Sequence, residues 1–215
     1  MAVDNRTEDE ITISGNPGRP VGEDGAHMLE RMNESHSGVT DWALGFFRFG
    51  DTDRVLDIGC GGGAALGKMS RRVPSGQLFG IDHSPVSVGT SEKNNAGDIA
   101  SGKMRIISGT VEKMPFPDDS FDKVLTVESF YFWPEPEKDL REVLRVTKRG
   151  GTFLLVADIY GRKDLSEKAK ANIARYSLFN PTPEEFRVLL EGAGFTDVRI
   201  HLEEKEGWIC AEGHK

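Results

Sequence analysis

The stretch Arg54-Val55-Leu56-Asp57-Ile58-Gly59-Cys60-Gly61-Gly62-Gly63-Ala64 decides the fold of this chain. Its apolar residues suit a buried strand, and the glycine cluster lets the backbone turn tightly and approach a ligand closely. The residues that follow have the one-sided apolar spacing of a helix. A strand, a glycine turn and a helix N-terminus in this order predict a nucleotide-cofactor site in an open α/β sheet.

The identity of the cofactor depends on Asp57, because the glycine spacing alone also fits the dinucleotide pattern G-x-G-x-x-G/A. Asp57 comes at the end of the strand, where its carboxylate would repel a pyrophosphate and attract a cation. S-adenosylmethionine (SAM) carries an ammonium and a sulfonium and has no phosphate. The charge at position 57 therefore favours SAM, with S-adenosylhomocysteine as the product.

A second acid supports an adenosine-containing ligand. Residues 77–81 form a second strand pattern that ends at Asp82. An acid about 20 residues beyond a glycine loop, at the tip of the next strand, is placed to bind ribose hydroxyls. We therefore expect Asp57 and Asp82 to serve opposite ends of one nucleoside ligand.

Composition limits the class of protein. The 215 residues carry a formal charge of −8, which argues against a nucleic-acid partner, and no apolar run is long enough for a membrane span. The polar N-terminus lacks the apolar core of a signal peptide. Cys60 and Cys210 lie in different kinds of segment, so a disulfide is not expected and the predicted location is cytoplasmic.

Along the chain, the sequence predicts one α/β domain behind two N-terminal segments. Residues 1–22 are expected to form a flexible arm, residues 23–50 two lid helices with Thr40 as the N-cap of the second, and residues 51–215 the cofactor-binding domain. Strands and helices alternate in this domain, and an antiparallel hairpin over residues 198–211 closes the sheet. The acids Asp118, Asp119 and Asp122 are interpreted as turn residues, so no metal site is predicted.

Four motifs, Val55–Gly63, Phe79–Asp82, Gly109–Phe121 and Leu140–Val156, resemble those of class I SAM-dependent methyltransferases. The similarity is to the small stand-alone type that acts in quinone biosynthesis and on other small molecules. It implies a Rossmann-like sheet of seven strands with helices on both faces. In that sheet six strands are parallel, the last is reversed, and SAM lies across the carboxyl ends.

The same resemblance implies roles for individual residues in cofactor binding. Asp57, Gly59 and Gly61 would line the methionine part, with Cys60 in the same loop, and Asp82 would hold the ribose. The adenine would be flanked by His83 and Ser84. Many relatives have an acid where this chain has Thr110, so the Thr110 hydroxyl or the backbone of Val111 is expected to serve the adenine instead.

Residues near the ends of the central strands are candidates for the acceptor site. Glu128 follows the fourth predicted strand and is expected either to stabilise the SAM ammonium or to position the acceptor. Candidates for catalysis are Tyr131 and, as a general base, His36. The expected walls of the acceptor site are Met32, Phe132, Trp133 and Tyr160.

The predicted function is methyl transfer from SAM to a small-molecule or peptide acceptor by in-line displacement. One alternative is a non-catalytic SAM-binding or partner subunit. The other is a nicotinamide-dependent oxidoreductase, which predicts an apolar residue at position 57. The acceptor atom, the need for a general base and the oligomeric state stay open at this point.

Overall fold

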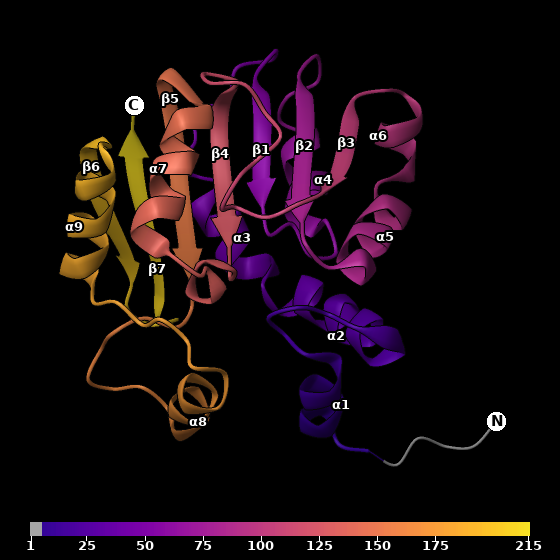
Figure 1. Cartoon of the computed structure of the whole chain (residues 1–215), viewed down its shortest axis with the longest axis vertical. Helices are drawn as coiled ribbons and strands as arrows, with labels where there is room; N and C mark the ends of the chain where they lie inside the picture. Colours follow the sequence, from indigo (N-terminus) through magenta and orange to yellow (C-terminus); the bar gives the residue numbers. More distant parts are fainter. Residues whose placement is uncertain (1–5) are drawn as a thin grey trace.

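The computed structural model describes residues 6–215, which form a single sheet flanked by helices (Figure 1). The strands follow the order β3-β2-β1-β4-β5-β7-β6. Strands β1 to β5 pair in parallel, whereas β7 is antiparallel to both β5 and β6. The predicted seven-stranded sheet with one reversed strand is therefore confirmed. The strands are β1 (Arg54–Ile58), β2 (Gln77–Asp82), β3 (Met104–Ser108), β4 (Phe121–Val127), β5 (Thr147–Ala157), β6 (Thr196–Glu203) and β7 (Trp208–His214).

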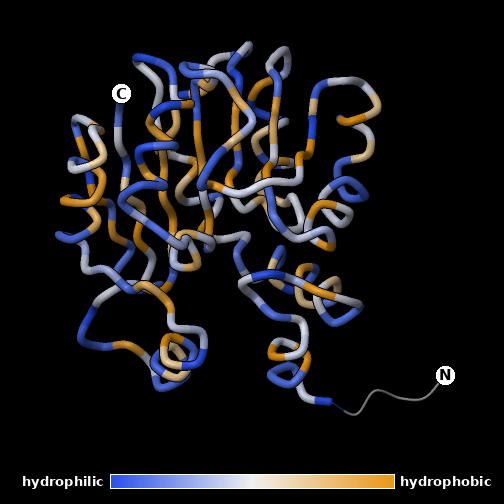
Figure 2. Tube along the Cα trace, in the orientation of Figure 1, coloured by the Kyte–Doolittle hydropathy of each residue, from blue (hydrophilic) through white to orange (hydrophobic). Residues whose placement is uncertain are grey.

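Alternate residues of each strand enter two different hydrophobic cores. Leu56 and Val124 belong to the core under α7 and α9, whereas Val55 and Leu125 belong to the core under α3 and α4. Figure 2 shows the resulting hydrophobic colour along the central strands. The helices are α1 (Glu8–Gly15), α2 (Gly22–Ser35), α3 (Ser37–Ala43), α4 (Ala64–Ser70), α5 (Pro85–Asn94), α6 (Ala96–Ala100), α7 (Pro136–Val146), α8 (Glu167–Tyr176) and α9 (Pro183–Ala193). No helix of the described chain is long and apolar enough to cross a lipid bilayer.

The turn between β1 and α4 requires glycine at position 59. Its φ of +71° is in the left-handed region, and a Cβ there would lie 2.5 Å from Oγ of Ser129. Ser129 in turn donates a hydrogen bond to the carbonyl of Ile58 (3.1 Å). The glycine loop and the segment after β4 are thus packed directly against each other.

The N-terminal helices lie beyond the carboxyl edge of the sheet (Figure 1). Part of the expected flexible arm is helical, because Thr7 and Glu10 form a capping box that starts α1, while residues 1–5 lie outside the described part. Thr40 does not cap the second lid helix. It lies inside α3, and its hydroxyl donates to the carbonyl of His36 (2.7 Å). The domain boundaries at residues 22 and 50 stay a prediction.

Candidate functional site

A cavity of about 370 Å³ opens at the carboxyl ends of β1, β2 and β4. The glycine loop forms its floor, and the segment 17–20 and the helix α2 cover it from the N-terminal side. A hydrogen bond from Ser84 to the carbonyl of Pro20 (2.5 Å) holds that cover in place. Gly18 lies close to the ring of Phe132, because a Cβ added to it would be 3.0 Å from that ring.

Asp57 lies at one end of this cavity with its carboxylate unpaired. The side chain is 2% exposed, and no hydrogen bond to it occurs among the described residues. Burial, followed by the negative charge of Asp82, raises the pKa of Asp57 to about 7. A buried carboxylate with neither a donor nor a cation beside it calls for a positive ligand group.

Asp82, by contrast, is anchored by the backbone. It accepts hydrogen bonds from the N–H of Gly61 (3.0 Å) and of Ser84 (2.9 Å), which fix both carboxylate oxygens. Each oxygen keeps a lone pair for a ligand hydroxyl. His83, Thr110 and Val111 line the cavity beside it. This end therefore suits a ribose and its base.

The residues at this end fit a cationic adenosyl cofactor. The unpaired, buried acid Asp57 matches an ammonium, and the pre-oriented acid Asp82 matches ribose hydroxyls. Among the described lining residues, no lysine or arginine lies beside these two acids to bind a phosphate. Cys60 also lines the cavity, and burial keeps the pKa of its thiol well above the ordinary value. The thiol is therefore a neutral wall group.

Glu128 lies at the other end in an unusual backbone conformation. Its φ is +55°, and its N–H donates to the carbonyl of Val156 (3.0 Å). Its carboxylate accepts hydrogen bonds from the N–H of Asp158 (2.5 Å) and from the hydroxyl of Tyr131. Burial, and then the adjacent carboxylate of Asp158, raise the pKa of Glu128 well above its usual range. Left-handed non-glycine residues of this kind cluster at functional sites.

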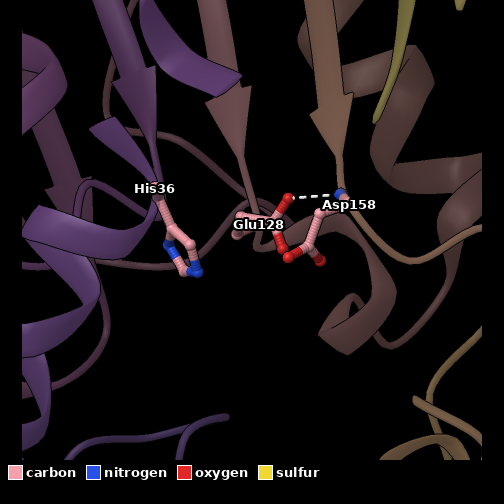
Figure 3. Close-up of side chains that lie close together, drawn as sticks. All are labelled: His36, Glu128 and Asp158. Carbon is pink, nitrogen blue, oxygen red and sulfur yellow. Dashed lines mark hydrogen bonds between the residues drawn. The ribbon is translucent and has the colours of Figure 1, made fainter. Parts of the chain in front are cut away.

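His36 and Asp158 flank Glu128 on opposite sides (Figure 3). One nitrogen or carboxylate oxygen of each of the three side chains lies within 4.8 Å of the others. Burial lowers the pKa of His36, and the charge of Asp158 opposes that shift. We call this set the strand-tip cluster. Its ligand types can hold a metal ion or another cation.

Lys68 holds the lid segment that carries His36. From α4, its ammonium donates to the carbonyl (3.1 Å) and the hydroxyl (2.8 Å) of Ser37 and pairs with Asp41 (2.5 Å). Ser37 follows His36 at the junction of α2 and α3. The lysine therefore ties this junction to the helix that follows the glycine loop.

Most residues predicted for the site line one cavity, but three do not. Ser84 is fully buried, caps α5 by accepting the N–H of Ser87, and reaches the site only through Asp82 and Pro20. Tyr131 lies behind Glu128, and Tyr160 is buried beyond β5. Of the predicted residues, those lining the cavity are Asp57, Gly59, Cys60, Gly61, Asp82, His83, Thr110, Val111, Glu128, Met32, His36, Phe132 and Trp133.

Asp158 and Lys68 are the residues that sequence reasoning missed. A usable signal existed for Asp158, because it directly follows a predicted strand, as Asp82 and Glu128 do. Lys68 gave no such signal, since its role depends on a contact with Ser37, 31 residues away.

Comparison with known proteins identifies the central part of the chain. Residues 56–155, from β1 to β5, match a family of methyltransferase domains. This part of the chain is a class I SAM-dependent methyltransferase domain. A relative in Oryza sativa, the chloroplastic 2-methyl-6-phytyl-1,4-hydroquinone methyltransferase 1, is 29% identical over 68% of this chain and 42% of its own length. The aligned part of the chain covers 40–42% of the length of the first curated relatives that it matches.

Two solved structures share the fold over nearly the whole chain. A putative methyltransferase from Haloferax volcanii, solved with a methyltransferase activator, has a TM-score of 0.76 at 22% identity, covering 95% of this chain and 97% of its own. A phosphoethanolamine N-methyltransferase from Haemonchus contortus, bound to S-adenosylhomocysteine, has a TM-score of 0.77 at 13% identity, covering 98% and 60%. The family and such complexes support SAM as the cofactor of this domain.

Proposed function

We propose that the protein transfers a methyl group from SAM to a small-molecule or peptide acceptor bound in the same cavity. The observation that carries this proposal is Asp57, a buried carboxylate without a partner in the described structure, at the cavity end that also holds Asp82. A cationic nucleoside relieves the cost of that buried charge, whereas a dinucleotide pyrophosphate increases it.

Each end of the cofactor has a residue suited to it. Asp57 would pair with the ammonium of SAM, Asp82 would accept the ribose hydroxyls, and Thr110 and Val111 lie where the adenine is expected. SAM supplies a methyl group that is activated by its sulfonium. The protein's own contribution is to orient the acceptor in line with that methyl group and to exclude water.

The cover over the cavity supports an enzyme over a non-catalytic binding subunit. The segment 17–20, α2 and the segment after β4 enclose more than a cofactor site, because the lining continues to His36, Glu128 and Trp133. An acceptor would lie in this part of the same cavity, beside the cofactor. The cytoplasmic location expected from the sequence remains part of this proposal.

Titration calorimetry with S-adenosylhomocysteine tests the cofactor assignment. Asp57→Asn removes the charge at nearly constant volume, and we expect an affinity loss of at least tenfold, consistent with one charge-assisted contact. The matched control is Asp51→Asn, which removes an exposed carboxylate just before β1 and should leave the affinity unchanged. Equal affinity of the Asp57 variant and the wild type would disprove the role of Asp57. Binding of NADH instead would favour the oxidoreductase.

A further inference from the structure

The two acids of the strand-tip cluster lie at the ends of different strands from Asp57 and Asp82, which mark the cofactor end of the cavity. Asp82 and Asp57 lie at the tips of β2 and β1, whereas Glu128 and Asp158 follow β4 and β5. Neighbouring strands are about 4.8 Å apart, so β5 lies roughly 14 Å from β2, whereas β4 is the direct neighbour of β1. A nucleoside that spans β2 and β1 leaves the tips of β4 and β5 for a second molecule.

The charge of the strand-tip cluster selects the chemistry of that molecule. Glu128 and Asp158 bring two carboxyl groups together, and no ion pair among residues 6–215 joins either of them to a lysine or arginine. Lys68 is the one lysine or arginine among the described lining residues, and its ammonium is occupied by Ser37 and Asp41. Burial and the adjacent Asp158 keep the pKa of Glu128 well above its usual range, so the negative charge of the cluster is that of Asp158. This charge repels a carboxylate or phosphate acceptor and attracts a cation.

The spacing of the cluster suits a nitrogen donor. Acceptors placed tetrahedrally around a nitrogen at about 2.8 Å lie about 4.6 Å from one another. The ligating atoms of His36, Glu128 and Asp158 all lie within 4.8 Å of one another, so one nitrogen atom can lie within hydrogen-bond distance of all three. Tyr131 and the N–H of Asp158 fix the Glu128 carboxylate from behind, so its orientation does not depend on the ligand.

We propose that the acceptor is a primary or secondary amine, whose nitrogen is held by Glu128 and Asp158 and deprotonated by His36. This inference rests on the proposed function and names its substrate class. Aliphatic amines are protonated at neutral pH and must lose that proton before the nitrogen can act as a nucleophile. Burial lowers the pKa of His36, so its imidazole is neutral and able to accept the proton.

The chemical step then balances within the cavity. The ammonium of the acceptor gives one proton to the imidazole of His36, and the freed lone pair attacks the methyl carbon. The new N–C bond forms as the C–S bond breaks, and the electron pair of that bond stays on sulfur as S-adenosylhomocysteine. The product is a methylated ammonium, and the proton on His36 passes to water when the cavity opens.

Two measurements on the full chain test the proposal. In the first, labelled SAM is offered with amines (benzylamine, N-methylbenzylamine, butylamine) and with alcohols and acids of matched size (benzyl alcohol, butanol, benzoic acid). We expect label in the amines only.

In the second measurement, benzylamine is titrated calorimetrically into the complex of the protein with S-adenosylhomocysteine. Glu128→Gln and Asp158→Asn should each weaken its binding at least tenfold while the affinity for S-adenosylhomocysteine is unchanged.

The base is tested separately from the binding residues. His36→Asn should lower kcat at least a hundredfold, retain benzylamine binding, and abolish the loss of activity that the wild type shows at low pH as His36 becomes protonated. Glu137→Gln, which changes an exposed carboxylate in the first turn of α7, is the control and should behave as the wild type.

The outcomes separate the two proposals. Failure to bind S-adenosylhomocysteine contradicts the proposed function itself. Normal binding of S-adenosylhomocysteine with methylation of the alcohols or acids, or with no binding of any amine, overturns the amine inference alone. Binding of zinc or manganese that depends on His36, Glu128 and Asp158, without amine binding, would also overturn it and would identify a metal centre.

Discussion

The two ends of the cavity hold their carboxylates in different ways. At the cofactor end, Asp82 is fixed by two backbone N–H groups, and Asp57 is left without a donor. The other end, which we assign to the acceptor and call the acceptor end, holds the strand-tip cluster of His36, Glu128 and Asp158. There Glu128 is held by Tyr131 and by the N–H of Asp158, and the carboxylate of Asp158 lies close to it. The first end therefore leaves one buried acid, Asp57, to pair with a single cation. The second keeps two acids together, which is stable only with a proton or a cation between them.

This difference follows from how each end is assembled. Asp57 and Asp82 come from two adjacent strands, β1 and β2. The two N–H groups that hold Asp82 lie in the loops that directly follow these strands, so local backbone geometry positions both acids. The acceptor end combines β4, β5 and the junction of α2 and α3, which are far apart in sequence. Its geometry therefore depends on long-range contacts, such as that between Lys68 and Ser37.

The largest expected effect concerns the charge of Asp57 without cofactor. Because its pKa is about 7 in the folded protein and near 4 when unfolded, the folded state holds the extra proton between these values. The free energy of unfolding should then fall as pH rises from about 4 to about 7 and be constant above that, with a total loss of up to about 4 kcal/mol.

Urea denaturation at pH 4 to 8 measures this loss. Asp57→Asn mimics the protonated acid, so its curve should lie above that of the wild type at pH 8 and approach it at low pH. Saturating S-adenosylhomocysteine should restore the wild type at pH 8, since its ammonium can pair with Asp57. Parallel curves for the two proteins would show that Asp57 is not a buried unpaired charge.

The next effect tests whether the two ends share a wall. In Gly59→Ala, the added Cβ meets Ser129 at 2.5 Å at a φ of +71°, so we expect about 3 kcal/mol of destabilisation and weaker binding at both ends. Gly89→Ala is the matched control, because a Cβ there meets nothing within 4 Å and alanine favours the helix. It should raise stability by about 0.5–1 kcal/mol. Loss of binding at one end only would contradict a shared wall.

A smaller effect isolates the acceptor end. Tyr131→Phe removes the hydroxyl that donates to Glu128, which should weaken benzylamine binding by about 1–2 kcal/mol and leave S-adenosylhomocysteine affinity unchanged. Burial and the charge of Glu128 raise the pKa of Tyr131 well above its usual value, so the hydroxyl remains a donor throughout the working pH range. Calorimetry on both ligands checks the result, with Tyr176→Phe in α8 as control. An equal loss for both ligands would assign Tyr131 a structural role.

Sequence reasoning predicted the sheet and the cofactor end well because both depend on local patterns. Apolar strand runs, the glycine cluster and the acids at positions 57 and 82 are contiguous in sequence, and strand order in such a sheet brings them together. The short helix of the N-terminal arm was missed because its first residues are polar. Only the capping box of Thr7 and Glu10 signals it.

The acceptor end was predicted only in part. His36 and Glu128 were chosen from position, but their approach depends on how the lid packs across the strand tips. The sequence predicts Tyr160 as a site residue but not Asp158, which directly follows β5 two residues earlier. The hydroxyl of Tyr131 points toward Glu128 and donates a hydrogen bond to it, and a catalytic role for Tyr131 stays a prediction. Such side-chain directions are fixed by packing, which spacing in the sequence does not specify.

The smallest expected effect tests whether the lid positions His36. Lys68→Met keeps the approximate length of the side chain but removes the hydrogen bonds to Ser37 and the ion pair with Asp41. The lysine side chain is 15% exposed, and we expect a loss of about 0.5–1 kcal/mol in the free energy of unfolding. A looser junction should lower kcat for benzylamine a few-fold, retain S-adenosylhomocysteine affinity within twofold, and speed hydrogen exchange at residues 36–40. Lys93→Met, in the last turn of α5, should change none of these. If kcat is unaffected while exchange at the junction rises, His36 does not need the lid to be rigid, and the acceptor end is positioned by the strand tips alone.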